Sequence, residues 1–435
     1  MTFGLAVFAL GSPGQAWAAN LPTGANVTHG QVSIQQQGAE ALRVLQSSQS
    51  AIVNWQSFDI GAGALVDIVQ PNIDAALLSR VVGGNPSEIL GSLNANGHLF
   101  LVNPNGIIFG KDAKVDVHAL IASTLDISDS AFLSGNISFS GDSEAAVINL
   151  GSITADSFAA LIAGKVTNAG SITAPGGDAA LLAADAILEV GEAAGGKITL
   201  DLSGLLEGVA SNTGSIDVAS ADGQGGSATI LGDQVSSSGS IDASGATGGG
   251  HVRIGGDYQG ANADLTNASQ ANVSGTISAD ATANGDGGRV IVWADGVTNY
   301  TGFASATGSG SGDGGFAEVS GKQTLNYDGL VDLSSESGLA GTLLLDPNDI
   351  TISYSAGTGT MTFDSGTNKY SDSTASTSNL NILTLTNQLA SSNVTITTTP
   401  GSGGNGDITV QQGFAWNSAN SLTLDADRNI VSNVG

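Results

Sequence analysis

The chain has 435 residues and a formal net charge of −28 at pH 7, because 39 acidic side chains face only 11 basic ones. This charge opposes binding to nucleic acid or to anionic lipid, and the absence of cysteine excludes disulfide bonds. Hydrophobic residues make up 41% of the chain, and 63 glycines occur with only eight prolines. That composition favours a packed β-structure with many tight turns over a disordered or collagen-like chain.

The first eighteen residues are typical of a secretory signal peptide. Phe3 to Leu10 is apolar, and Ala16-Trp17-Ala18 supplies the small residues that signal peptidase requires. We therefore predict cleavage between Ala18 and Ala19. No Lys or Arg precedes Arg43, so the basic first region of the signal is incomplete in this sequence. The apolar run is too short to form a membrane anchor.

Residues 19–145 form a first region that is less repetitive than the rest. Alternating apolar and polar residues in Gln31–Ile34 and Ala51–Ile60 predict short strands. A stack of β-coils exposes an open strand edge at its end, and this edge needs a cover. The position of this region predicts that it includes a β cap.

The segment Leu99–Gly110 predicts a strand, a turn and a second strand. Two apolar runs flank Asn103-Pro104-Asn105-Gly106. Asn103 can accept a local hydrogen bond, Pro104 pre-sets φ for the second turn position, and Gly106 tolerates unusual exit geometry. We expect the tetrad to order a protruding hairpin with paired strand edges.

From about residue 146 the sequence repeats itself loosely. One unit reads Asn-x-Gly-Ser-Ile-x-Ala, and its central isoleucines are spaced by 19, 44, 25 and 36 residues: Ile153, Ile172, Ile216, Ile241 and Ile277. A second unit is Gly-Gly followed by an alternating apolar strand, and it begins at Gly195, Gly225, Gly249 and Gly287. This drifting period with short strands favours a β-solenoid over a string of β-sandwiches, whose cores are richer in aromatic residues. We divide the repeats into a β-helix region, 146–345, and a further β-rich region, 346–435, which we expect to be truncated.

Several segments resemble the amino-terminal secretion domain of two-partner secretion exoproteins, the filamentous-haemagglutinin-like family of Gram-negative bacteria. The matching segments are Val53–Ile60, Ser79–Ser87, Ile89–Leu93 and Leu101–Lys111, with looser matches at Gly287–Asp295 and Leu343–Ile350. One branch of the family carries a second motif, Asn-Pro-Asn-Leu. The nearest tetrad here is Gln70-Pro71-Asn72-Ile73, which indicates the adhesin branch, so we give Gln70 no recognition role.

The resemblance implies an all-β fold, a right-handed parallel β-helix with an N-terminal β cap. It also implies passage through the Sec machinery and the periplasm. A dedicated outer-membrane β-barrel transporter, whose periplasmic domains recognise the secretion domain, would then release the protein or leave it at the cell surface. We expect Asn103, Pro104, Asn105 and Gly106 to carry information for this export. A purely structural turn is the alternative.

Two functions remain open for the whole exoprotein. The first is a non-enzymatic adhesin whose β-helix presents distal regions to a host or neighbouring-cell surface. The alternative is the carrier stalk of a toxin, cytolysin or contact-dependent inhibition protein, with its active part beyond Gly435.

The sequence shows no pattern of catalytic or metal-binding residues. His29, His98, His118 and His251 are isolated, with no second ligand at metal-binding spacing, and they give no support to haem scavenging. Arg253 and Arg289 are read as equivalent, outward-facing positions of two repeats. We therefore expect no metal, no cofactor and no enzymatic activity, which would need clustered carboxylates and a basic residue.

Overall fold

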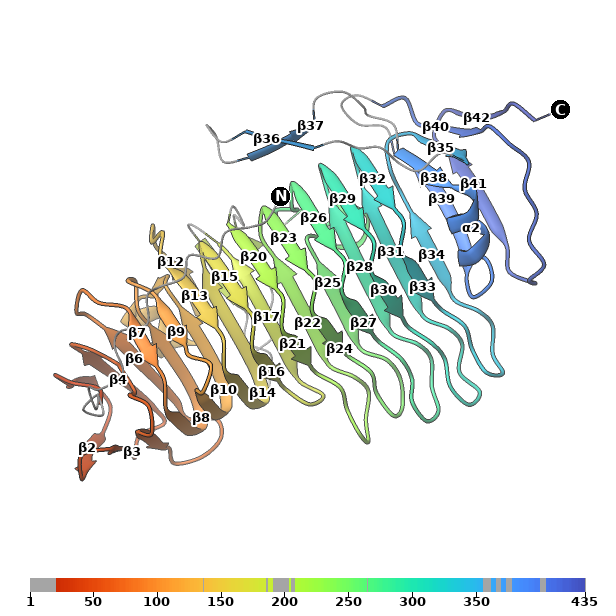
Figure 1. Ribbon diagram of the computed structural model, residues 1–435. Coiled ribbons are helices and arrows are strands. Elements are labelled where there is room, and N and C mark those ends of the chain that lie inside the picture. The colour runs from red at the N-terminus through yellow and green to blue at the C-terminus, as the bar shows by residue number, and fades with distance from the viewer. Residues whose placement is uncertain are drawn as a thin grey trace, which may run out of the picture.

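The computed structural model describes residues 21–135, 137–184, 187–190, 203–204, 208–263, 265–354, 361–364, 369–372, 378–399 and 404–434. The predicted signal peptide and its cleavage site at Ala18 and Ala19 lie outside these residues. The described chain winds into a parallel β-helix, and the colours of Figure 1 follow one another along its axis from the N-terminal to the C-terminal coils. The predicted fold class is confirmed.

Three walls of parallel strands surround the axis, and most coils contribute one strand to each wall. Walls 1 and 2 belong to one 23-stranded sheet because three long strands bend around the corner between them, whereas wall 3 is a separate 13-stranded sheet. Wall 1 contains β3 (Ala41–Gln46), β5 (Leu65–Val69), the first halves of β8 (Ser92–Val102), β10 (Lys114–Ser123) and β14 (Ser152–Ala163), then β16 (Ser171–Thr173), β21 (Ser215–Asp217), β24 (Ser240–Asp242), β27 (Thr276–Ser278), β30 (Phe303–Ser305) and β33 (Leu330–Asp332).

Wall 2 contains β4 (Ser50–Trp55), β6 (Ala76–Val81), the second halves of β8, β10 and β14, then β17 (Asp178–Ala183), β22 (Ser227–Leu231), β25 (His251–Ile254), β28 (Arg289–Ala294), β31 (Phe316–Gly321), β34 (Thr342–Leu345), β39 (Asn393–Thr398) and β41 (Leu422–Ala426). Wall 3 contains, in spatial order, β7 (Ser87–Ile89), β9 (Ile107–Phe109), β13 (Ala146–Asn149), β15 (Lys165–Asn168), β20 (Val209–Asn212), β23 (Gln234–Ser237), β26 (Gln270–Val273), β29 (Val297–Tyr300), β32 (Thr324–Tyr327), β38 (Ser378–Asn381), β35 (Ile350–Ser353), β40 (Asp407–Val410) and β42 (Asn429–Ser432).

The isoleucines of the first repeat unit form one buried ladder inside wall 1. Ile172 lies in register with Ile153 below it and with Ile216 above it, and the ladder continues through Ile241 and Ile277. All five side chains are at most 2% exposed. Because each coil cannot bury its own inward side chains, stacking supplies the core.

The second repeat unit is confirmed only in part. Gly225, Gly249 and Gly287 precede β22, β25 and β28, which stack in parallel register. The unit at Gly195 lies outside the described residues, and the strand that pairs with β22 from the preceding coil is β17, after Gly177. A Cβ added at Gly226 would lie 1.9 Å from the carbonyl oxygen of Gly177. Glycine is therefore required where consecutive coils approach this closely.

Two antiparallel strands cap the N-terminal end, as predicted. β1 (Asn26–His29) pairs with β4, and β2 (Val32–Gln37) pairs with β3. The walls continue through residues 145 and 345 without a break in strand pairing. The proposed three-part division of the chain stays a prediction.

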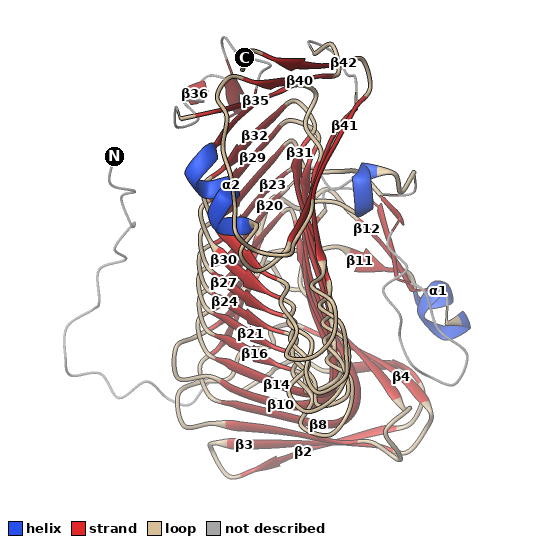
Figure 2. Cartoon of the chain, turned by 90° about the vertical axis from the view of Figure 1, so that its right-hand side faces the viewer, coloured by secondary structure: helices blue, strands red, loops and turns tan. Residues whose placement is uncertain are grey.

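An insertion covers the outer side of wall 2 near the N-terminal end (Figure 2). It contains β11 (Asp126–Ile127), α1 (Asp129–Ser134), β12 (Ile137–Ser140), β18 (Ile187–Val190) and β19 (Ser203–Gly204). A second apolar cluster lies between it and the wall and includes Phe100, Ile121 and Phe139. Arg80 of β6 holds the insertion through ion pairs with Asp126, at 2.8 Å, and with Asp129, at 2.7 Å.

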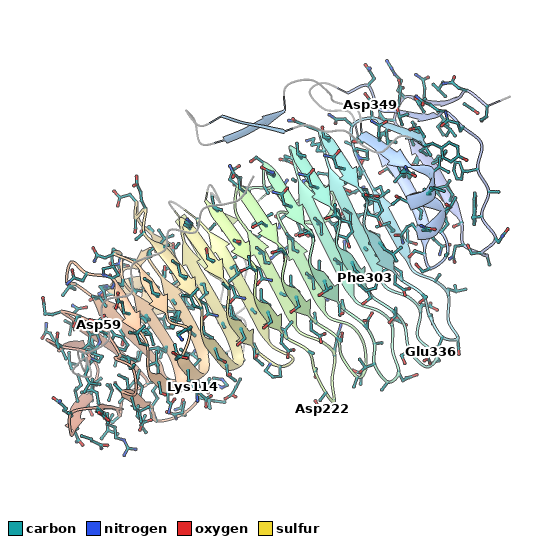
Figure 3. All side chains as sticks on the ribbon, viewed as in Figure 1. Asp59, Lys114, Asp222, Phe303, Glu336 and Asp349 are labelled. Carbon is teal, nitrogen blue, oxygen red and sulfur yellow. The ribbon has the colours of Figure 1, made fainter. Side chains whose placement is uncertain are left out.

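The C-terminal end departs from the simple winding. β38 lies between β32 and β35 although β35 precedes it in sequence. A hairpin of β36 (Met361–Asp364) and β37 (Lys369–Asp372) separates β35 from β38, and α2 (Ile382–Gln388) follows β38 and packs against β33. In the described part of the chain, no strand joins wall 1 after β33. Figure 3 shows Asp222 and Glu336 on loops that lead from wall 1 to wall 2, at the rim of the rod.

Candidate functional site

The predicted tetrad forms a corner of the β-helix and not a hairpin. Asn103 to Gly106 connect the wall 2 half of β8 to β9 in wall 3. β8 pairs there with β6 and β10, and β9 pairs with β7 and β13, all in parallel. The expectation of a protruding hairpin is therefore wrong. Turn chemistry specifies a change of chain direction but not the partners of the flanking strands, which here are the neighbouring coils.

Asn103 lies inside this corner and is fully hydrogen-bonded. Its side chain is 0% exposed, and its Nδ2 donates to the Asn85 carbonyl and to Ser87 Oγ, both at 3.0 Å. Its Oδ1 accepts from the backbone N–H of Asn105 at 2.9 Å and from Asn105 Nδ2 at 3.1 Å. A buried amide with both ends satisfied fixes the corner in one shape.

The other three residues complete the turn. The N–H of Gly106 donates to the carbonyl of Asn103 at 3.0 Å, and Gly106 has φ +113°, a conformation that favours glycine. Asn105 Nδ2 also donates to the Gly83 carbonyl at 2.9 Å. Pro104 is exposed and Asn105 is half-buried. The outer surface of the tetrad therefore consists of Pro104 and part of Asn105.

Three sequence segments singled out above meet at this corner as successive layers. The N–H of Val82, in Ser79–Ser87, donates to the carbonyl of Trp55, in Val53–Ile60. The loop after Val82 in turn accepts the two asparagine side chains of the tetrad. Val82 is 51% exposed. We call the stacked turns 56–59, 82–86 and 103–106 the motif corner, and Asp59 marks its position in Figure 3.

Gln70 occupies a different corner, between walls 1 and 2. Its side chain is 4% exposed, and its amide nitrogen Nε2 donates to the Ala75 carbonyl at 2.7 Å. Its backbone N–H donates to Asn96 Oδ1 at 2.7 Å. The structure thus gives Gln70 a place in the turn that leads into β6.

Two of the four histidines are not isolated in space. The rings of His98 and His118 stack with centroids 5.7 Å apart, and His118 Nδ1 lies 3.4 Å from Asp156 Oδ2. Burial and the neighbouring His118 lower the pKa of His98. Sequence spacing missed this contact because one coil separates the two residues. Within the described residues, no group of three or more His, Cys, Asp or Glu side chains is arranged to hold a metal ion.

Arg253 and Arg289 are not equivalent positions, contrary to the sequence interpretation. In the pairing of β25 with β28, Arg289 lies opposite His251 and Arg253 lies opposite Ile291. Arg289 directly follows its glycine pair, whereas Arg253 is the third residue after its own, so the two side chains fall at different register positions. Arg253 pairs with Asp257 at 3.3 Å, and the Arg289 guanidinium lies over the rings of Tyr258 and Phe316.

None of the helices in the described ranges has the length and apolar character needed to cross a membrane. Comparison with known proteins matches residues 18–309 to the TPS secretion domain. The chain is 40% identical over 116 residues to a heme/hemopexin-binding protein of Haemophilus influenzae, which is 26% of this chain and 12% of that protein. The corresponding protein of strain KW20 is 36% identical over 169 residues, which is 37% of this chain and 18% of that protein.

Among solved structures, the HMW1 secretion domain of Haemophilus influenzae is similar to this chain. The two share 27% identity with a TM-score of 0.50, over 74% of this chain and 100% of that domain. The aligned segments thus cover less than a fifth of the curated relatives and the whole of the solved secretion domain.

Proposed function

Because the chain belongs to the TPS secretion domain family of two-partner secreted exoproteins, we propose that it directs an exoprotein out of the cell through an outer-membrane β-barrel transporter. The match to residues 18–309 carries this proposal, and the fold shared with the HMW1 secretion domain supports it. In this route the Sec machinery brings the chain to the periplasm, where the leader is removed after Ala18. Periplasmic domains of the transporter then bind the secretion domain, and the product is released or stays at the cell surface.

The motif corner is the part of the surface that we assign to transporter recognition. Its outer side combines the exposed Val82 and Pro104 with the half-buried Asn105. Asn103 has no exposed surface, so it contributes by holding the turn in shape and not by direct contact. Apolar side chains on a rigid turn suit specific recognition because little conformational freedom is lost on binding.

A secretion assay tests the proposed export function. The chain is expressed with and without its transporter in a strain that has no other one, and the culture supernatant and periplasm are compared. We expect the protein in the supernatant only when the transporter is present. Equal secretion without the transporter contradicts the proposal.

For the exoprotein as a whole, we propose adhesion through regions that the β-helix presents at a distance. A toxin carrier is the alternative already named, and the names of the curated relatives favour a third, binding of haem or hemopexin. The secreted full-length product is tested for attachment to host cells, for killing of neighbouring bacteria, and for capture by immobilised hemopexin. Attachment to host cells without the other two activities supports adhesion. Killing of neighbouring bacteria, or capture by hemopexin, would replace adhesion as the proposed function.

We also propose that this part of the chain has no enzymatic activity. Arg253 and Arg289 are engaged by Asp257 and by two aromatic rings, respectively, so neither is placed to stabilise charge that develops on a substrate. Turnover of a polysaccharide by the purified chain would contradict this proposal.

A further inference from the structure

A short insertion covers the outer side of wall 2 in the middle of the rod. Residues 256–263, which we call the flap, leave the winding after β25 and include the 3₁₀ turn η1 (Tyr258–Gly260). The flap is pinned at its start, where Asp257 accepts from the N–H of Tyr258 at 2.7 Å and pairs with Arg253. It contacts β28 and β31.

Aromatic rings and Arg289 form the surface under the flap. The Arg289 guanidinium carbon lies 4.9 Å from the Tyr258 ring centroid and 5.1 Å from that of Phe316. Gly260 lies against Trp293, where a Cβ would be 2.5 Å from Nε1. Trp293 Nε1 donates to Asp295 at 3.0 Å. The flap therefore shields Trp293 and one side of Arg289 from solvent.

Glu318 of β31 lies beneath the flap as a fully buried carboxyl group. Its side chain is 0% exposed, and its register neighbours on wall 2 are Ile291 and Leu344. Oε2 accepts from the N–H of Gln259 at 3.0 Å, whereas Oε1 has no hydrogen-bond partner. Gln259 is the one non-glycine residue with positive φ, +53°, in the described ranges, so the contact is made by a strained residue.

The charges around Glu318 do not offset the cost of burying its carboxylate. Asp346, which follows β34, repels the carboxylate, and Arg289 of β28 attracts it. The charged residue of the flap, Asp257, is engaged by Arg253. Asp295, which follows β28, accepts from Trp293 and Asn267. Burial is the largest effect and raises the pKa of Glu318 to about 7, although hydrogen bonding from the Gln259 N–H and from Ser320 acts in the opposite direction.

We propose that the flap is a pH-responsive cover, closed over Glu318 while the carboxyl is protonated and opened when it ionises. Opening hydrates the carboxylate, releases the strained Gln259, and uncovers Trp293, Arg289 and Phe316. The proposed opening of the flap is independent of the export function, because it depends only on contacts among residues 251–346.

The size of the effect follows from the pKa of Glu318 in the closed and open states of the flap. A carboxyl group with a pKa of about 7 under the flap returns towards 4.5 once water reaches it. Linkage then allows the open-to-closed ratio to rise by at most about 300-fold between acidic and alkaline pH, since each pKa unit is a factor of ten.

Hydrogen exchange of the full chain at pH 5 and pH 8 measures this ratio. Protection factors, which already correct for the pH dependence of intrinsic exchange, are followed for the amides of 257–263. We expect a fall of one to two orders of magnitude at pH 8, and no change in the turn 306–315, which serves as internal control. Equal flap protection at both pH values overturns the proposal.

Two variants identify the titrating group. In Glu318→Gln the neutral amide keeps an acceptor for the Gln259 N–H, so the flap should stay protected at both pH values. In Asp346→Asn a repelling charge is removed, so the transition should persist and shift to lower pH. If Asp346→Asn abolishes the transition and Glu318→Gln retains it, Glu318 is not the switch. Tyr258→Ala, which removes a ring from Arg289, should loosen the flap at both pH values and shows that the assay detects opening.

Discussion

The side-chain amide of Gln388 pairs with both backbone groups of Val331 at the free edge of wall 1. Gln388 Oε1 accepts from the Val331 N–H at 2.9 Å, and Nε2 donates to the Val331 carbonyl. Tyr327 donates its hydroxyl to the same Oε1 at 2.6 Å. An amide side chain on α2 thus takes the place of one peptide unit of the strand that would otherwise follow β33. It supplies hydrogen-bond partners to backbone groups on a strand edge that is buried.

Replacing Gln388 with Leu should destabilise this end of the β-helix. Leucine forms helix about as well as glutamine, but it leaves the buried N–H of Val331 without a partner, at a cost of about 2–3 kcal/mol. Hydrogen exchange at Val331 and urea denaturation measure the loss. The control is Leu383→Ala, because Leu383 is on the same helix and 62% exposed. Equal effects of both variants would show that the edge pairing contributes nothing.

Substitutions at Asn103 and Pro104 should distinguish residues that hold the motif corner in shape from residues that contact the transporter directly. Asn103→Ala removes four hydrogen bonds of a buried amide and should cost roughly 2–4 kcal/mol, with loss of secretion and degradation in the periplasm. Pro104→Ala changes an exposed ring and should leave the unfolding transition within about 0.5 kcal/mol of wild type. Secretion and urea denaturation are measured for each. Wild-type secretion of Asn103→Ala contradicts its role in export.

The buried asparagines at the end of three wall 3 strands should tolerate no negative charge. Asn149 Nδ2 donates to Asn168 Oδ1, and Asn168 Nδ2 donates to Asn212 Oδ1, each at 2.8 Å. Asn168→Asp removes the second donor and buries a carboxyl group, which should cost roughly 3–5 kcal/mol at pH 8. The loss should shrink at pH 4, because burial raises the pKa of such a group and it protonates.

The matched control is Asn299→Asp on the outer side of wall 3. Asn299 makes a similar ladder, donating to Asn272 at 2.8 Å and accepting from Asn326 at 2.7 Å, but it is only half-buried. Water can hydrate the new carboxylate, so we expect a loss of about 1 kcal/mol or less. Thermal unfolding at the two pH values distinguishes the variants, and equal losses would refute the burial argument.

Glu318 should make the chain less stable as pH rises from about 4.5 to 7. Its folded pKa is raised to about 7, so the folded state binds more protons than the unfolded state in this window and stability falls with pH. Glu318→Gln should therefore match wild type near pH 4 and exceed it at pH 8 by up to about 3 kcal/mol. Urea denaturation at both pH values measures the difference in free energy of unfolding between the two proteins. A wild type that is more stable than the variant at pH 8 would contradict the prediction.

Periodicity predicted the parts of this fold that depend on repetition. The isoleucine ladder and the glycine pairs are visible in sequence because each inward position meets its own counterpart one coil later. Their uneven spacing also has a structural reason. The 44 residues between Ile172 and Ile216 include β18 and β19 of the insertion, and the 36 residues between Ile241 and Ile277 include the flap.

Features that depend on contacts between unlike coils were beyond sequence reasoning. Asn103-Pro104-Asn105-Gly106 carries turn chemistry, but its burial comes from the loop at 83–87, which no local pattern connects to it. α2 arises in Ile-Leu-Thr-Leu-Thr-Asn-Gln, a segment with strand-like residues. Its N-cap Asn381 and the pairing of Gln388 with a distant edge override that preference. The stacking of His98 on His118 likewise depends on the length of one coil.

Substituting a helix for a strand has a mechanical consequence. A rod whose coils are joined along three sides resists flexure in every direction, because bending must stretch hydrogen bonds on the convex side. In the described part of the chain, the side beyond β33 carries α2 in place of a further hydrogen-bonded strand. We therefore expect stiffness there to differ between directions, with the α2 side opening before walls 2 and 3 under a tensile load applied past residue 392.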